Sequence, residues 1–173
     1  MNFEQRAKIE EVDLVKATQA DIDFYYNLKC EKSNIYWSGL LTRPDYDDFK
    51  DWYEINVINN KISFYFITHN NLKVGAIYYR IIDENHCNYL GLAVTEKVEG
   101  RGIATFAVSK FLEHIRMTNP KCKIIDFYIR IDNFASQKVH EKLGFKKTGK
   151  TEAVYLESEG KKITMEYWRY VLS

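Results

Sequence analysis

The chain has 173 residues, of which 46% are hydrophobic and 28% are charged, and its formal net charge is +1. This length and composition are typical of one soluble domain that buries a core without help from disulfides or metals. The near-zero charge removes the simplest argument for a nucleic-acid-binding protein, which would need a strongly basic domain.

The first third of the chain predicts one strand followed by two helices. Residues 12–17 alternate well enough between apolar and polar to form a strand. Thr18 and Asp21 have the spacing of a capping box, so a helix should begin there and end near Glu31. Apolar residues recur at helical spacing over residues 46–57, which predicts a second helix, and we expect a loop between the two.

Three segments in the middle of the chain have the pattern of antiparallel strands. They cover residues 62–69, 74–82 and 88–95. Asn70-Asn71 is a hairpin turn signal between the first two, and the polar residues 83–85 separate the second from the third.

The remaining segments predict a helix at 103–117, a strand at 124–131, a helix at 133–143, and strands at 145–156 and 163–171. No repeat, linker or low-complexity tract interrupts the chain, so we predict a single domain over residues 1–173. The expected fold class is α/β (α+β), with a mixed, mostly antiparallel central sheet of about seven strands and helices on both faces.

A glycine-rich turn runs from Glu99 to Ala104, between an apolar strand and a helix that begins at once. The first N–H groups of a helix lack partners and carry partial positive charge. Glycines such as Gly100 and Gly102 let a backbone approach an anion closely, so the turn is suited to a pyrophosphate.

Two common nucleotide-binding loops share this physics but need different residues. A Walker loop would need Gly-Lys-Ser/Thr where the chain has Gly102, Ile103 and Ala104. A dinucleotide fingerprint would need glycine at Thr105 and a series of parallel strand-helix units. A tight strand-to-helix turn without any ligand remains an alternative for this segment considered alone.

Two blocks resemble the GNAT superfamily of acetyltransferases. The turn resembles its acetyl-CoA motif, Gln/Arg-x-x-Gly-x-Gly/Ala, with Glu99 in place of Gln or Arg. Residues 133–136 and 139–145, Asn-Phe-Ala-Ser and Val-His-Glu-Lys-Leu-Gly-Phe, resemble the Asn-x-x-Ser/Ala and Glu-Lys-Leu-Gly-Phe block of the same family. Within it, this pattern is most similar to the branch of ribosomal-protein N-terminal and spermidine acetyltransferases.

The resemblance implies transfer of an acetyl group from acetyl-CoA to a primary amine by direct attack on the thioester. The acceptor would be a small-molecule amine, a polyamine, an amino sugar or a protein N-terminus. A splayed strand would pair with the pantetheine arm, and a backbone N–H near Leu92 would polarise the carbonyl. The residues implied for acetyl-CoA and CoA are Leu92, Ala93, Val94, Glu99, Gly100, Arg101, Gly102, Ile103, Ala104, Thr105, Asn133, Ser136 and Lys142.

Ser136 and His140 are the candidate catalytic residues. Many family members place a tyrosine at the position of His140, where it protonates the departing thiolate. Ser136 is the better substitute here, and the two residues share one helix face because they are four positions apart. Two structural alternatives stay open: Asn133 as a helix N-cap, and His140 as a boundary histidine with a satisfied hydrogen bond.

The acceptor is expected to contact the segment after the first predicted helix, through Glu31, Tyr36 and Trp37. Residues 21–54 hold eight acids and four bases, an excess that would suit a cationic amine unless it is only a solvated helix face. The 13 tyrosines fit either a tyrosine-rich sheet or a partly aromatic substrate pocket.

A catalytically silent CoA-binding sensor on the same fold is the main alternative function, and a nucleotide-phosphate-binding module is a weaker one. The three scattered cysteines and four scattered histidines predict reduced thiols and no metal site. Residues 1–6 lack the apolar core of a signal peptide, and no apolar run is long enough to span a membrane. We expect a cytoplasmic protein without nucleic-acid or membrane partners, whose C-terminal strands would offer an edge for a homodimer.

Overall fold

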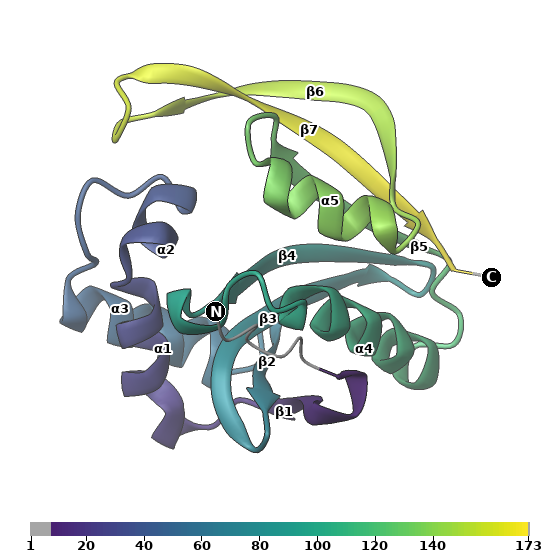
Figure 1. Ribbon diagram of the computed structural model, residues 1–173, viewed down its shortest axis with the longest axis horizontal. Coiled ribbons are helices and arrows are strands. Elements are labelled where there is room, and N and C mark those ends of the chain that lie inside the picture. The colour runs from purple at the N-terminus through teal and green to yellow at the C-terminus, as the bar shows by residue number, and fades with distance from the viewer. Residues whose placement is uncertain (1–7, 173) are drawn as a thin grey trace, which may run out of the picture.

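The computed structural model describes residues 8–172, in which seven strands form one sheet in the order β1-β2-β3-β4-β5-β7-β6 (Figure 1). Neighbouring strands are antiparallel except for β4 and β5, which are parallel. The strands are β1 Val12–Lys16, β2 Ser63–His69, β3 Leu72–Asp83, β4 His86–Val94, β5 Ile124–Arg130, β6 Lys146–Leu156 and β7 Lys161–Val171. The helices are α1 Ile22–Lys29, α2 Lys32–Trp37, α3 Tyr46–Tyr53, α4 Ile103–Thr118 and α5 Phe134–Lys142.

Shorter helical turns flank several of these elements: η1 Ile9–Glu11, η2 Gln19–Asp21, η3 Glu54–Ile58 and η4 Glu96–Val98. The predicted capping box is present, because the Thr18 N–H donates to Asp21 Oδ2 over 2.8 Å. The predicted fold class and element order are confirmed except at α2, where a loop was expected. Six residues are too few to show a helical period, so α2 left no recognisable signal.

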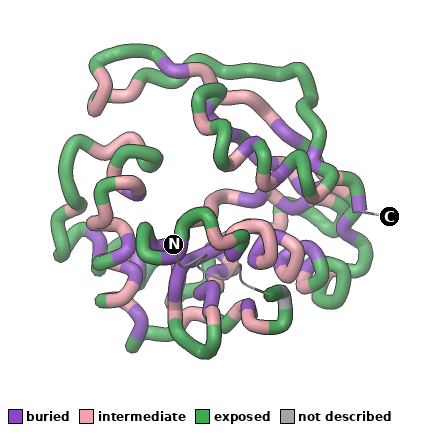
Figure 2. Tube along the Cα trace, in the orientation of Figure 1, coloured by how far each residue is buried: buried purple, intermediate pink, exposed green. Residues whose placement is uncertain are grey.

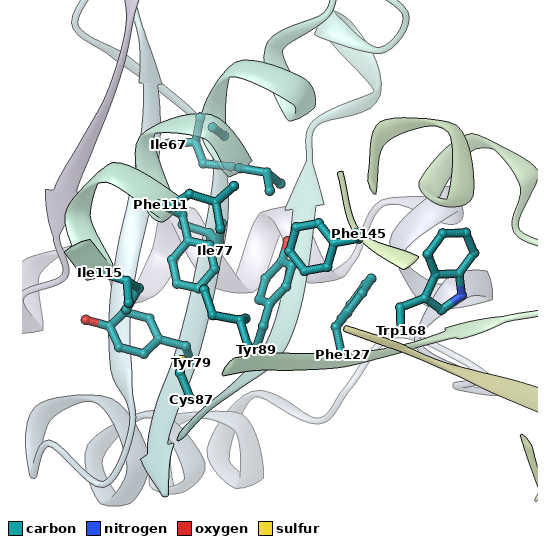
Figure 3. Close-up of a cluster of buried hydrophobic side chains, with 14 of the residues drawn as sticks. Ile67, Ile77, Tyr79, Cys87, Tyr89, Phe111, Ile115, Phe127, Phe145 and Trp168 are labelled. Carbon is teal, nitrogen blue, oxygen red and sulfur yellow. The ribbon is translucent and has the colours of Figure 1, made fainter. Parts of the chain in front are cut away.

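The sheet separates two hydrophobic clusters. Alternate residues of β3 point to opposite faces, so that Ile77 and Tyr79 join a cluster with α4 and α5, while Ala76 joins a cluster with α1 and α3. Figure 3 shows part of the larger cluster, in which Phe111 of α4 lies against the tyrosines of the sheet. The predicted helices on both faces are therefore confirmed.

The parallel strands β4 and β5 pair over only three residues, from His86 opposite Ile124 to Asn88 opposite Asp126. Within residues 8–172, β4 has no ladder partner on that side beyond Asn88. The β3–β4 register also shifts, since Tyr79 pairs with Tyr89 and Tyr78 pairs with Gly91. Leu90 is the extra residue of this bulge, and a bulge bends the strand that carries it.

The β6–β7 hairpin extends beyond α5 toward α2 (Figure 1). Figure 2 shows β6 exposed along almost its whole length, in contrast to the buried strands at the centre of the sheet. Among residues 8–172, no helix is both long and apolar enough to cross a membrane. The N-terminal residues on which the signal-peptide prediction rests lie outside the described part of the chain.

Candidate active site

Two cavities meet at the unpaired edge of β4. The α5-side cavity has a volume of about 520 Å³ and is lined by β4, the turn after it and α5. The hairpin-side cavity has a volume of about 690 Å³ and lies between β4, the α1–α2 region and the β6–β7 hairpin. Both are lined by residues 90–93 of β4, so the two cavities adjoin each other where β4 no longer pairs with β5.

The glycine-rich turn places the start of α4 beside the α5-side cavity. Gly102 precedes α4 with φ +86°, a left-handed conformation that glycine adopts without strain. A Cβ at this position would meet only Phe106, at 3.8 Å, so the space before the helix is open. Ile103, the first residue of the helix, is 1% exposed and its side chain belongs to the core cluster. The unpartnered N–H groups of this 16-residue helix make the turn suited to an anion.

The α2 segment is joined to this turn by what we call the reciprocal capping network. The Glu31 carboxylate accepts from Thr95 Oγ1 over 2.5 Å and from the Glu96 N–H over 2.9 Å. In return, the Ser33 N–H donates to Glu96 Oε1 over 2.8 Å. Ser33 Oγ donates to Glu99 Oε1 over 2.9 Å. Glu31 therefore accepts from a backbone N–H at the start of η4, and Glu96 accepts from a backbone N–H in the first turn of α2.

This network accounts for Glu99, the residue that departs from the family motif. Its carboxylate bonds to α2, while Glu99 still lines the α5-side cavity. Glu31, expected to contact the acceptor, lines neither cavity and is bonded within the network.

Arg130 lies where the two cavities meet and is 5% exposed. It forms ion pairs of 2.7 Å with both Asp132 and Glu159, and the hydrogen bonds to Asp132 first, then to Glu159, raise its pKa. The guanidinium also lies 5.0 Å from the Tyr36 ring and 5.2 Å from the Trp37 ring. Arg130 thus connects β5, α2 and the turn between β6 and β7.

Ser136 and His140 stand in different environments although both belong to α5. Ser136 lines the α5-side cavity, and its N–H donates to Asn133 Oδ1 over 3.0 Å, which makes Asn133 the N-cap. His140 is 0% exposed and packs on the rings of Phe127 and Tyr89. Burial lowers the pKa of His140 to about 4, and its Nδ1 lies 2.8 Å from the Ser136 carbonyl oxygen.

His140 is therefore a neutral core residue at pH 7 and lines neither cavity. These surroundings oppose the role of general acid that the family resemblance suggested for it. They agree with the structural alternative in one respect, since the Nδ1–H is bonded to a backbone carbonyl. His140 is nevertheless a core residue rather than a boundary one, and its buried Nε2 has no hydrogen-bond partner within residues 8–172.

The region from residue 11 to residue 146 matches the family model described as the acetyltransferase (GNAT) domain. The chain belongs to the GNAT acetyltransferase family. No curated protein matches it in a sequence search.

Solved GNAT structures share the whole fold of this chain at low sequence identity. The spermidine N-acetyltransferase of Vibrio cholerae, in complex with CoA and spermine, is 13% identical with a TM-score of 0.80, over 94% of this chain and 96% of that one. The microcin C7 self-immunity acetyltransferase MccE, in complex with acetyl-CoA and AMP, is 19% identical with a TM-score of 0.77, over 98% and 97%. The Salmonella typhimurium acetyltransferase that modifies the N-terminal serine of ribosomal protein L7/L12 is 16% identical with a TM-score of 0.78, over 98% and 100%.

The GNAT fold brings most of the sequence-predicted cofactor residues together. Those that line the α5-side cavity are Leu92, Ala93, Val94, Glu99, Gly100, Asn133 and Ser136. Those that do not line it are Arg101, Gly102, Ile103, Ala104, Thr105 and Lys142. The first five of these continue from Gly100 into the first turn of α4, whereas Lys142 is exposed in the last turn of α5.

The hairpin-side cavity contains residues that the sequence patterns did not predict. Tyr167 donates its hydroxyl to Glu152 Oε2 over 2.5 Å, and Glu152 is the only acid that lines this cavity in the described part of the chain. Lys29 also lines it and donates to Ser38 Oγ. The acids of α3 do not line it, so the predicted acid excess lies outside the cavity.

Aromatic residues supply much of the remaining lining. Of the two aromatic residues predicted to contact the acceptor, Trp37 lines both cavities, whereas Tyr36 lines neither and contacts Arg130. The other rings of the hairpin-side cavity are those of Tyr25, Tyr78, Tyr128 and Tyr167. A Cβ at Gly91 would lie 2.6 Å from the Tyr78 ring, so glycine is needed where that ring crosses β4. No metal-binding group of three or more His, Cys, Asp or Glu occurs within residues 8–172.

Proposed function

We propose that this GNAT protein binds acetyl-CoA in the α5-side cavity and a primary amine in the hairpin-side cavity, and transfers the acetyl group between them. The observation that carries the proposal is the open edge of β4 between both cavities, next to the glycine turn at the start of α4. The acceptor classes are a small-molecule amine, a polyamine, an amino sugar and a protein N-terminus. We propose that the chain works as one domain.

The unpaired part of β4 offers backbone N–H and C=O groups to the amides of a pantetheine arm. The first N–H groups of α4 and the turn from Glu99 to Gly102 would hold the pyrophosphate. Leu92 lies in the part of β4 that has no ladder partner on the β5 side, which favours a free backbone N–H near Leu92 for polarising the thioester carbonyl.

The acceptor amine must be neutral when its nitrogen attacks the thioester carbon. The carbon–sulfur bond then breaks, and the Ser136 hydroxyl, which lines the α5-side cavity, donates a proton to the thiolate and regains one from solvent. In the hairpin-side cavity, the Glu152 carboxylate is the base available to take the proton that the amine loses. The products are the acetylated amine and CoA.

Thermal unfolding with acetyl-CoA, CoA, ATP and NAD in parallel tests the cofactor assignment. A ligand present at about 100 times its dissociation constant adds about 2.7 kcal/mol to the free energy of unfolding. We expect stabilisation by acetyl-CoA and CoA, followed by thiol release from acetyl-CoA when a suitable amine is added. Stabilisation by ATP or NAD alone would overturn the proposal. Binding without transfer to any amine would favour the CoA-binding sensor.

We also propose a cytoplasmic location, since the cysteines Cys30, Cys87 and Cys122 are free thiols. We propose a homodimer in which the long exposed edge strand β6 pairs with a second copy of the chain. Equilibrium sedimentation of the purified chain would test it, and a monomer at all concentrations would contradict it.

A further inference from the structure

The charges that line the hairpin-side cavity are Lys29, Arg130 and Glu152. Arg130 is neutralised by its own ion pairs with Asp132 and Glu159, neither of which lines the cavity. The charges left for a ligand are therefore one ammonium and one carboxylate.

Lys29 is at the C-terminal end of α1 and is partly buried. Its Nζ donates to the neutral hydroxyl of Ser38, and within residues 8–172 it forms no ion pair with a carboxylate. Burial lowers the pKa of Lys29, and no counter-charge opposes that effect. A desolvated ammonium without a counter-ion is costly, and an anionic ligand in the cavity would offset the cost.

Glu152 comes from β6, a different element on the other side of the cavity. It is bonded to the Tyr167 hydroxyl, and the rings of Tyr128 and Trp37 line the same space. A carboxylate among aromatic rings favours a cationic group. The cavity thus has a site for an amine at Glu152 and a separate site for an anion at Lys29.

We infer that the acceptor is a primary amine that also carries an anionic group, a carboxylate or a phosphate, which Lys29 binds. This inference rests on the proposed function. A polyamine would bring a second ammonium to Lys29, where the like charges repel each other, and a neutral amino sugar would leave Lys29 without a counter-ion. The cavity therefore favours an amine that carries both charges over a polyamine or a neutral amino sugar.

Four probes of similar length test this ranking: 4-aminobutanoate, 3-aminopropylphosphonate, butylamine and putrescine. We expect kcat/KM for the better anionic amine to exceed that of butylamine by about tenfold or more, because a hydrogen-bonded charge pair replaces a solvated end. Putrescine should be the poorest. The two anionic probes distinguish a carboxylate-binding from a phosphate-binding site.

The Lys29→Met variant should reduce the preference for anionic amines over butylamine to near one. Lys29→Glu should reverse the ranking in favour of putrescine. Lys50→Met is the matched control, since Lys50 is an exposed lysine of α3 outside both cavities, and it should keep the wild-type ranking. Circular dichroism and stabilisation by acetyl-CoA verify that each variant is folded.

The outcomes separate this inference from the proposed function. If acetyl-CoA does not stabilise the wild-type protein against unfolding, the proposed function itself is refuted. Stabilisation by acetyl-CoA together with a preference for putrescine would overturn only the inference. The inference would also be overturned if neither anionic amine reacts and neither stabilises the CoA complex. A cavity with one site for an amine and one for an anion should bind the smallest molecules that carry both groups.

Discussion

The two ends of the β4–β5 pair differ sharply. Where the strands pair, Cys87 is 0% exposed, and one residue beyond the pairing Tyr89 is also 0% exposed and stacks on Phe127. Where they diverge, residues 90–94 are only partly buried and line cavities. The same strand therefore contributes side chains to the core at its closed end and an unpaired backbone edge to two cavities at its open end. The difference follows from where the pairing stops.

Helix α5 repeats this contrast within about one turn. His140 packs against Phe127 and Tyr89 of the closed end, whereas Ser136 lines the α5-side cavity at the open end. A chemically active side chain does not form a catalytic group unless it reaches a cavity. The two ends should consequently respond differently to substitution.

The largest effect should come from Gly102→Asp at the open end. The substitution adds a negative charge at the start of α4 and strains a left-handed position, so affinity for acetyl-CoA should fall by about 1000-fold or more. Thermal unfolding with acetyl-CoA measures the loss. Gly149→Asp is the control, because Gly149 has a similar φ of +81° in β6 with open space around it. Equal loss in both variants would mean that strain alone is responsible.

His140→Phe tests the closed end through pH. Burial lowers the pKa of His140 from 6.5 to about 4, so on acidification the unfolded chain binds the proton first. Its stabilising contribution is complete above pH 6.5 and is lost as the pH falls to 4, which amounts to about 3 kcal/mol. Urea unfolding across this range should give a smaller pH dependence in the variant. An unchanged dependence would show that His140 titrates as freely in the folded protein as in the unfolded one.

Ser136→Ala should reduce kcat by about a hundredfold and leave acetyl-CoA affinity within about twofold, because it removes a proton donor but keeps the backbone bond to Asn133. Thiol release and thermal unfolding measure the two quantities. Ser158→Ala, in the turn before β7, serves as the control. A variant with the wild-type rate would remove Ser136 from the mechanism.

Glu31→Gln should have the smallest effect. It weakens the reciprocal capping network, which should lower the free energy of unfolding by about 1 kcal/mol. Because α2 carries Trp37, the acceptor KM should rise severalfold while acetyl-CoA affinity changes little. The exposed Glu113→Gln of α4 is the matched control. A large loss of acceptor turnover without loss of stability would instead indicate that Glu31 contacts the acceptor directly.

Local sequence patterns were sufficient for most of the fold and for much of the lining of the α5-side cavity. The helical period of residues 103–117 and the turn at Asn70-Asn71 are encoded within a few residues, and so are the glycine turn and the Asn133 cap. These features predicted the element order and seven residues that line the α5-side cavity.

The lining of the hairpin-side cavity was decided only by the tertiary structure. Lys29 and Glu152 are far apart in the chain, and in the sequence each of them is indistinguishable from an ordinary charged surface residue. They line one cavity because β7 pairs with β5 and carries β6 toward α2, a long-range pairing that no local period records. Burial of His140 has the same origin, since its position in the motif cannot reveal that Phe127 and Tyr89 enclose it. Local period and capping are properties of neighbouring residues, whereas burial and charge environment depend on which distant strands meet.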